Sequence, residues 1–448
     1  MLSGLSDISS HLIVGAGPAG LAAARAFRSQ GLDVEVLETH QDVGGIWDQD
    51  NPGSPMYDSA HFISSARRSG FAGFPMPEHF PDYPPHRLLL DYLRDFTRAY
   101  GLYDAIRFGI RVERAIPDDG GWTVHASDGS KRRYATLTAA SGTTWSPRIP
   151  MWPGDFAGDL VHSSRYRSSK EFHGKRVLIV GAGNSGVDIA CDAARSASRA
   201  TISVRRGYHL IPKHLFGLPA DEFGARGPHL PTAIRQRVFA RTLRILNGDL
   251  TRHGWPRPDH RLFETHPIVN DQIVHHLRHG DITVRPDVHG FDGDDVVFVD
   301  GTRQPVDLVV AATGYDFALP YIDEALFDWR GGRPQLYLQT FSPTLPRFAA
   351  LGLAEFDGAA WPVFDDLADL IARGFAALER GESTWDRLRA VVRGPAPDVS
   401  GGVRHVASDR HAAYLHRASL SAHIRDIRQR LGWPPRVATT PTAPTLTA

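Results

Sequence analysis

The sequence predicts an α/β fold with two Rossmann-like dinucleotide-binding domains, the second inserted into the first. Two glycine-rich motifs carry this prediction, residues 15–20 (GAGPAG) and 181–186 (GAGNSG). Each follows a short apolar stretch typical of a buried strand and precedes an alanine-rich stretch typical of a helix. In that context the glycines make a tight turn and let a pyrophosphate approach the backbone at the helix N-terminus. We therefore expect one chain to bind two dinucleotides.

The first motif lies in residues 1–153, which we expect to form the first part of a dinucleotide-binding domain. Strands are predicted at 12–14 and 34–38. Glu38 ends the second of them, where a carboxylate can accept hydrogen bonds from a ribose diol. Such a carboxylate favours FAD or NAD as the first dinucleotide.

The rest of this segment predicts a helix, three short strands and a linker. Leu89, Leu93, Phe96 and Tyr100 give the helix an apolar face. The strands are expected around 112–114 and 122–124 and within 137–142. Prolines at 147, 150 and 153 then indicate a stiff connection.

The second motif lies in residues 154–300, predicted to be an NADPH-binding domain with strands at 177–180 and 201–204 and a mostly helical excursion over 207–280. Val204 stands as far from its motif's first glycine as Glu38 does, and Arg205 and Arg206 follow. An apolar residue and two guanidinium groups suit a 2′-phosphate, which a carboxylate would repel. The alternative is that both arginines form a solvated strand end.

The chain is then expected to return to the first domain over residues 301–435. Residues 307–315 predict a buried strand ending in a turn of small residues, and a late helix has an apolar face of Leu420, Ile424, Ile427 and Leu431. The Thr/Pro/Ala-rich residues 436–448 predict a disordered tail.

Composition limits the classes of partner. The 448 residues include 50 basic and 50 acidic side chains, so bulk charge gives no reason to expect nucleic acid or an anionic membrane as a partner. The single cysteine, Cys191, excludes disulfides and CxxC redox chemistry. With no apolar stretch of membrane-spanning length and no room for a signal peptide ahead of the first motif, we expect a cytoplasmic protein.

The chain has 22 histidines, so metal binding needs separate consideration. His275, His276 and His279 lie close together on a predicted helix, and His209 and His214 flank a short Pro-Lys segment. Because no cysteine or carboxylate follows at a matching ligand spacing, we predict no metal site.

Five further motifs carry a family resemblance. Residues 156–166 (FAGDLVHSSRY) match the FxGxxxHxxxY motif of flavin-containing monooxygenases. The other motifs occur in family order: GGIW at 44–47, FPMP at 74–77, PIVND at 267–271 and ATGY at 312–315. The sequence resembles this family over roughly residues 10–380.

The resemblance implies that residues 1–153 and 301–435 form an FAD-binding domain, interrupted by the smaller NADPH-binding domain of residues 154–300. It also implies hydride transfer from NADPH to the flavin, capture of O2 as a C4a-hydroperoxyflavin, and oxygen transfer to the amine nitrogen or sulfide sulfur of a small molecule. The residues expected to bind FAD are Gly15, Gly17, Pro18, Ala19, Gly20, Glu38, Gly45, Trp47 and Val112. Those expected to bind NADPH are Tyr166, Gly181, Gly183, Asn184, Ser185, Gly186, Arg205 and Arg206, with Thr313 and Gly314 between the two cofactors.

One departure from the family affects the substrate side of the flavin. Many members have an Asn before the FPxP loop, whereas this chain has Ser64 and Ser65 there. These serines are our candidate catalytic residues, although a hydroxyl cannot donate and accept in the geometry of an amide. Two alternatives stay open: Baeyer–Villiger oxygenation of ketones, against which Tyr166 argues because that group's motif usually ends in Trp, and an uncoupled NADPH oxidase or NADPH-sensing flavoprotein. A homodimer is compatible with the sequence.

Overall fold

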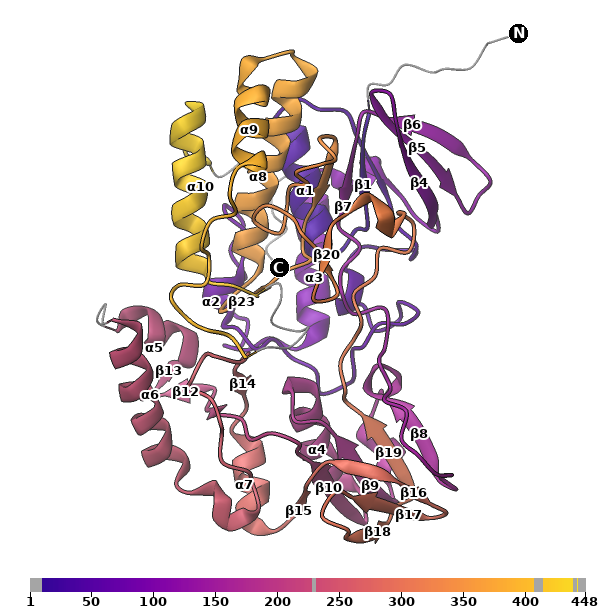
Figure 1. Ribbon diagram of the computed structural model, residues 1–448, viewed down its shortest axis with the longest axis vertical. Helices are drawn as coiled ribbons and strands as arrows, with labels where there is room; N and C mark the ends of the chain where they lie inside the picture. Colours follow the sequence, from indigo (N-terminus) through magenta and orange to yellow (C-terminus); the bar gives the residue numbers. More distant parts are fainter. Residues whose placement is uncertain (1–9, 228–230, 407–413, 438–440, 442–448) are drawn as a thin grey trace.

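The computed structural model describes residues 10–227, 231–406, 414–437 and 441. Two α/β domains lie one above the other along the long axis of the molecule (Figure 1). Each is built around a five-stranded sheet whose paired strands are all parallel. This arrangement confirms the predicted fold class of two Rossmann-like units.

The first domain has the sheet order β22-β7-β1-β2-β3. Its strands are β1 (His11–Val14), β2 (Val34–Leu37), β3 (Ile106–Arg107), β7 (Thr136–Ala139) and β22 (Phe348–Ala350). All four residues of β1 are buried, as expected for a central parallel strand covered on both faces. β1 and β2 correspond to the first two strands predicted from the sequence.

Helices cover one face of this sheet, and a small antiparallel sheet packs on the other face, where its Trp122 and Val124 share a core with Leu12 of β1 and Leu137 of β7 (Figure 1). The alanines of α1 let it pack closely against α8. The helices are α1 (Pro18–Ser29), α2 (Ala66–Ser69), α3 (His86–Ala99), α8 (Trp361–Glu379), α9 (Ser383–Arg393) and α10 (Arg417–Leu431), with short 3-10 turns η1 (Gly45–Trp47), η2 (Leu102–Ala105) and η6 (Glu324–Leu326). The antiparallel strands are β4 (Val112–Asp118), β5 (Gly121–Ala126) and β6 (Lys131–Tyr134). Short strand pairs complete the domain: β20 (Trp329–Arg330) with β21 (Arg333–Pro334), and β23 (Glu355–Phe356) with β24 (Tyr414–Leu415).

The second domain has the sheet order β15-β10-β9-β19-β8. Its strands are β8 (Asp159–His162), β9 (Arg176–Val180), β10 (Arg199–Ser203), β15 (Ile282–Arg285) and β19 (Leu308–Ala311). Along β9, Val177 and Ile179 share a core with α4 (Asn184–Ser196), whereas Leu178 and Val180 pack on a three-stranded meander. The meander consists of β16 (Val288–Asp292), β17 (Asp295–Phe298) and β18 (Arg303–Pro305), and the 3-10 turns η3 (Ser163–Arg165) and η4 (Ser169–Phe172) precede β9.

The expectation that the chain is back in the first domain from residue 301 is wrong. Leu308 of β19 pairs with Asp159 of β8 and with Val177 of β9, so this strand belongs to the second sheet. The chain reaches the antiparallel sheet of the first domain further on, where Ala115 N–H donates a hydrogen bond to the Tyr321 carbonyl. A buried apolar strand has the same local pattern in either sheet, so its sequence could not assign it.

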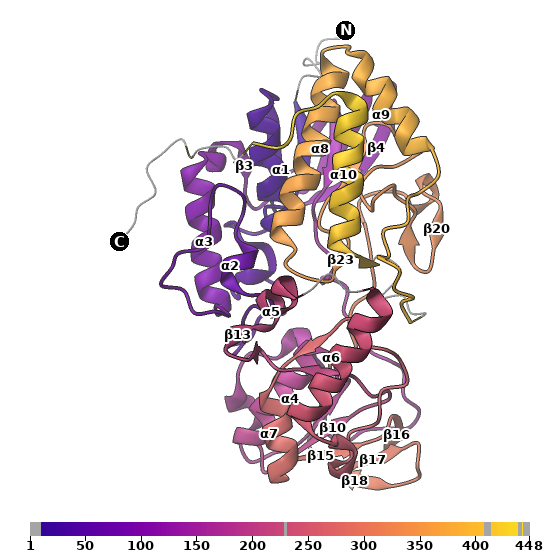
Figure 2. The same cartoon turned by 90° about the vertical axis from the view of Figure 1, so that its left-hand side faces the viewer.

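The excursion predicted over 207–280 is mostly helical. It contains α5 (Ala220–Arg226), α6 (Thr232–Asn247), η5 (Leu250–His253) and α7 (Gln272–His279). Short strands connect them: β11 (Leu210–Ile211) with β14 (Ile268–Val269), and β12 (His214–Leu215) with β13 (Leu218–Pro219). Figure 2 shows α5 and α6 on the side of the second domain that faces α2 and β23 of the first.

The tail predicted as disordered over 436–448 lies mostly outside the described residues. Arg436 departs from that prediction, because its guanidinium donates to Asp366 of α8 at 2.9 Å and lies 3.7 Å from Asp365. Across the described part of the chain, no helix is both long and apolar enough to cross a bilayer.

Candidate functional site

The loop between β1 and α1 can be made only by glycine at its two ends. Gly15 has φ +104°, and a Cβ on it would lie 2.7 Å from the Ala140 carbonyl oxygen. A Cβ on Gly20 would lie 1.8 Å from the Gly15 oxygen. The loop therefore holds α1 tightly against β1, as a dinucleotide fingerprint requires.

At Gly17, in the middle of the loop, the need for open space and not the backbone conformation favours glycine. Its backbone is ordinary, with φ −74° and ψ −177°, and an added Cβ would meet only Gly45, with the Cα at 3.6 Å and the N at 4.0 Å. The main chain thus leaves open space there, at the N-terminus of α1, which no side chain among the described residues caps. Open backbone at an uncapped helix N-terminus fits the pyrophosphate of a dinucleotide.

Glu38 follows β2 and lies against this loop. Its carboxylate accepts hydrogen bonds from the backbone N–H groups of Ala16, at 2.6 Å, and His40, at 2.8 Å. Burial raises the pKa of Glu38, while these two bonds act in the opposite direction. The carboxylate is therefore held beside the glycine loop, where the ribose of a bound dinucleotide would lie.

The other residues predicted to bind FAD lie in three separate elements. Trp47, in η1, packs edge-on against Phe62 with ring centroids 5.0 Å apart and lies 6.1 Å from Trp361 at the start of α8. Val112 is the buried first residue of β4. Pro18 and Ala19 are in the first turn of α1.

The loop between β9 and α4 repeats the geometry of the first. Gly181 has φ +105°, and a Cβ on it would lie 2.5 Å from the Ala312 carbonyl oxygen; one on Gly186 would lie 2.1 Å from the Gly181 oxygen. Gly183 precedes α4 with φ −73° and ψ 178°, and Ser185 is exposed. The structure therefore places the second fingerprint at a helix N-terminus that, like the first, no described side chain caps.

Asn184 connects this loop to the PIVND segment. Its side-chain oxygen accepts from Val269 N–H at 3.0 Å, and its amide donates to the Pro267 carbonyl at 3.2 Å. The Asn270 amide donates in turn to Asp188 of α4 at 2.6 Å. Two motifs far apart in the sequence thus hold each other in place.

The two arginines after β10 differ in their surroundings. Val204 is buried, as an apolar residue at the strand end should be. Arg206 pairs with Asp259 at 3.1 Å. Arg205 is exposed and has no hydrogen bond or ion pair within the described ranges, so its guanidinium is available to a ligand.

His162 joins the ends of two adjacent strands. It ends β8, and its Nε2 is 2.9 Å from the carbonyl of Gly314, which follows β19. Gly314 has φ +85°, and the Thr313 hydroxyl donates to the carbonyl of Arg148. Burial lowers the pKa of His162, so a neutral ring fixes the ATGY turn. This agrees with a structural connection at the FxGxxxHxxxY motif.

Tyr166, predicted to bind NADPH, is 1% exposed. Its hydroxyl donates to Asp192 of α4 at 2.9 Å, and its ring stacks on Phe172 with centroids 4.8 Å apart. Tyr166 therefore packs beside α4 and binds it through Asp192. Its direct contact with a nucleotide stays a prediction.

Hydrogen bonds connect the segment around residues 57–59 of the first domain to α4 of the second. Tyr57 donates to Asp188 at 3.2 Å and Ser59 to Asp192 at 2.5 Å, both on α4. Burial raises the pKa of Asp188. The carboxylates of α4, the helix that follows the second glycine motif, therefore connect the two domains.

Ser64 and Ser65, the candidate catalytic residues, lie in the same segment. Ser65 is 1% exposed, and both its N–H, at 2.9 Å, and its hydroxyl, at 3.0 Å, donate to Asp221 of α5. Ser64 is half-buried. Sequence reasoning missed Asp221 because no local pattern connects it to a serine so far away in the chain.

The chain matches the family model "Flavin-binding monooxygenase-like" over residues 10–392. The chain belongs to this family. Flavin-containing monooxygenase 3 of Rattus norvegicus is 32% identical over 396 residues, covering 82% of this chain and 73% of that protein. Dimethylaniline monooxygenase [N-oxide-forming] 2 of Oryctolagus cuniculus is 30% identical over 390 residues, with the same coverages, 82% and 73%. A steroid monooxygenase bound to NADP is similar in fold, with a TM-score of 0.71, 21% identity and coverage of 95% of this chain and 98% of that one.

Family membership confirms the predicted resemblance and the predicted enzyme class. The chain is a flavin monooxygenase, and the predicted cofactors, FAD and NADPH, are those of this family. The site geometry agrees with this class, because each of the two glycine loops leads into a helix whose N-terminus is left without a side-chain cap in the part of the chain that the structure describes.

Proposed function

We propose that this flavin monooxygenase uses NADPH to oxygenate the amine nitrogen or sulfide sulfur of a small molecule. The choice of NADPH as coenzyme is supported by the residues that follow β10 in the second domain. There Val204 is buried, and Arg205 is exposed without a partner in the described ranges. The nucleophile class is supported by the N-oxide-forming relative. Bound FAD supplies the oxygen chemistry, and the chain supplies binding, orientation and hydrogen bonds.

The residues of the chain then have separate tasks. The Gly15–Gly20 loop and Glu38 hold FAD, and the Gly181–Gly186 loop with Arg205 holds NADPH. Thr313 and Gly314, which follow β19, are proposed to lie between the two cofactors. Ser64 and Ser65 are the hydroxyl donors proposed on the substrate side.

Baeyer–Villiger oxygenation is the runner-up reaction, and a substrate panel separates the two. We expect NADPH consumption to accelerate with amines and sulfides, with N-oxide or sulfoxide as product, and not with a cyclic ketone. Product analysis against NADPH consumed checks this. Lactone formation from the ketone, without oxygenated amine or sulfide, would overturn the proposed substrate class.

The alternative from another functional class is an NADPH oxidase. A second prediction tests it and rests on the serines that stand where many family members have an Asn. With only a serine hydroxyl near the reacting oxygen, we expect some NADPH to be oxidised with release of H2O2. Because Ser65 already binds Asp221, the Ser64→Asn variant should reduce that release, by about fivefold for one hydrogen bond of about 1 kcal/mol.

The Ser65→Asn variant is the matched control for this prediction. Its larger side chain disturbs the contact with Asp221, so it should not reduce H2O2 release. Peroxide and oxygenated product are both measured per NADPH consumed. Release of one H2O2 per NADPH with no product across the whole panel would leave an NADPH oxidase in place of a monooxygenase.

We also propose a cytoplasmic location, which is supported by a sequence whose single cysteine, Cys191, leaves no pair for a disulfide. A homodimer stays a prediction that light scattering on the purified enzyme can check.

A further inference from the structure

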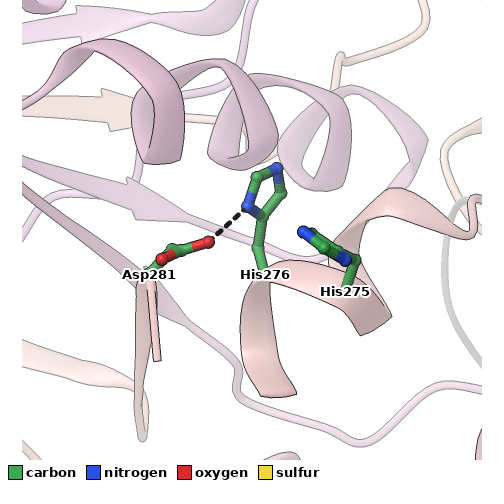
Figure 3. Close-up of side chains that lie close together, drawn as sticks. All are labelled: His275, His276 and Asp281. Carbon is green, nitrogen blue, oxygen red and sulfur yellow. Dashed lines mark hydrogen bonds and ion pairs between the residues drawn. The ribbon is translucent and has the colours of Figure 1, made fainter. Parts of the chain in front are cut away.

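Three potential metal ligands meet at the end of α7, away from both glycine loops. One ligand atom from each of His275, His276 and Asp281 lies within 4.8 Å of the other two. Figure 3 shows the His276 ring between Asp281 and His275, and His276 Nδ1 is 2.8 Å from an Asp281 oxygen. The ring of His279 lies 4.2 Å from that of His275, one helical turn away. Four groups able to bind a transition metal are therefore confined to one corner of the second domain.

The local backbone explains how the carboxylate reaches the histidines. Gly280 ends α7 with φ +77°, a left-handed conformation that reverses the chain. Asp281 N–H then donates to the His276 carbonyl at 3.0 Å. This turn supplies the carboxylate that the sequence spacing alone did not reveal.

The electrostatic environment favours a cation. The C-terminus of a helix carries a partial negative charge, and Asp281 adds a full one directly after it. The nearby cation Arg278 donates to the Asn247 carbonyl at 2.9 Å and is engaged there. His275 and Asp281 are exposed, which leaves the group open to solvent ions.

We propose that His275, His276 and Asp281 bind Zn²⁺, with His279 placed to become the fourth ligand. Imidazole nitrogens with a carboxylate form a typical zinc ligand set. Bonds of about 2.1 Å would bring the ligand atoms to about 3.4 Å from each other, which side-chain rotation can achieve from the present positions. The metal would replace the proton that His276 Nδ1 and Asp281 share.

Bound Zn²⁺ would fix the end of α7 to the start of β15. Ile282, next to Asp281, pairs with Ala200 of β10, and Asn270, just before α7, binds Asp188 of α4. The metal would thus stabilise the part of the second domain that supports its glycine loop. This is a structural role, and the oxygenation reaction does not require it.

Calorimetric titration of ZnCl2 into the FAD-loaded enzyme tests the proposal. The protein is freed of any histidine tag, treated with a chelator and dialysed. We expect about one Zn²⁺ per chain and a rise in melting temperature on metal addition. His276→Ala and Asp281→Asn should each weaken binding at least about tenfold.

His289→Ala is the matched control, because His289 is exposed on β16, away from α7. This variant should bind Zn²⁺ as the parent does. Flavin absorbance and circular dichroism check that each variant is folded, and Asp281→Asn, which keeps the side-chain size, serves if His276→Ala is not. Absence of binding in the parent, or equal affinity in the parent and in Asp281→Asn, would overturn the proposal.

Discussion

Replacing Gly17 with valine should give a folded protein that is purified without its flavin. An added Cβ would meet only Gly45, no closer than 3.6 Å, and the backbone at φ −74° accepts any L-residue. The fold therefore tolerates the side chain, but the side chain fills the space where a pyrophosphate must approach. Loss of about 3 kcal/mol of charge-assisted hydrogen bonding corresponds to FAD binding weakened by more than about a hundredfold.

The measurement is the ratio of flavin absorbance to protein absorbance after purification. Gly17→Ala should lose less flavin than Gly17→Val, because only one methyl group intrudes. Gly224→Val on α5 is the matched control, since a Cβ there meets nothing within 4 Å and the residue lies in the other domain. Full flavin occupancy in Gly17→Val would show that this loop does not bind FAD.

The parts of the structure that depend on local pattern could be predicted from the sequence. Strands expected at 12–14, 34–38, 177–180 and 201–204 correspond to β1, β2, β9 and β10. Their apolar residues are buried because parallel strands are covered on both faces. Positive φ at the first glycine of each motif likewise follows from the motif itself.

The parts of the structure that depend on long-range pairing could not be predicted from the sequence. β19 has the pattern of a buried strand, and only its hydrogen bonds to β8 and β9 place it in the second sheet. The contact of Ser65 with Asp221 joins residues of different domains, and no periodicity indicates it. Asp281 reaches His276 through the left-handed turn at Gly280, which a ligand-spacing rule does not include.

The second large effect is expected at Arg205. Truncation to alanine should weaken NADPH binding about ten- to hundredfold, because a charge-assisted contact to phosphate is worth roughly 1.5 to 3 kcal/mol. Binding of NADH, which lacks the 2′-phosphate, should change little. Dissociation constants for both coenzymes, measured by titration of the FAD-loaded enzyme, check this difference.

Arg206→Ala is the matched control, because the two arginines are adjacent but differ in their partners. Arg206 is already paired with Asp259 at 3.1 Å, so binding a phosphate would require it to leave that carboxylate. Arg205 has no such competitor among the described residues. The loss for Arg206→Ala should therefore be the smaller of the two. Equal losses of affinity for NADPH and NADH in Arg205→Ala would indicate damage to the fold. Unchanged affinity for both coenzymes would mean that this arginine is only solvated. Only a selective loss of NADPH affinity assigns the 2′-phosphate to Arg205.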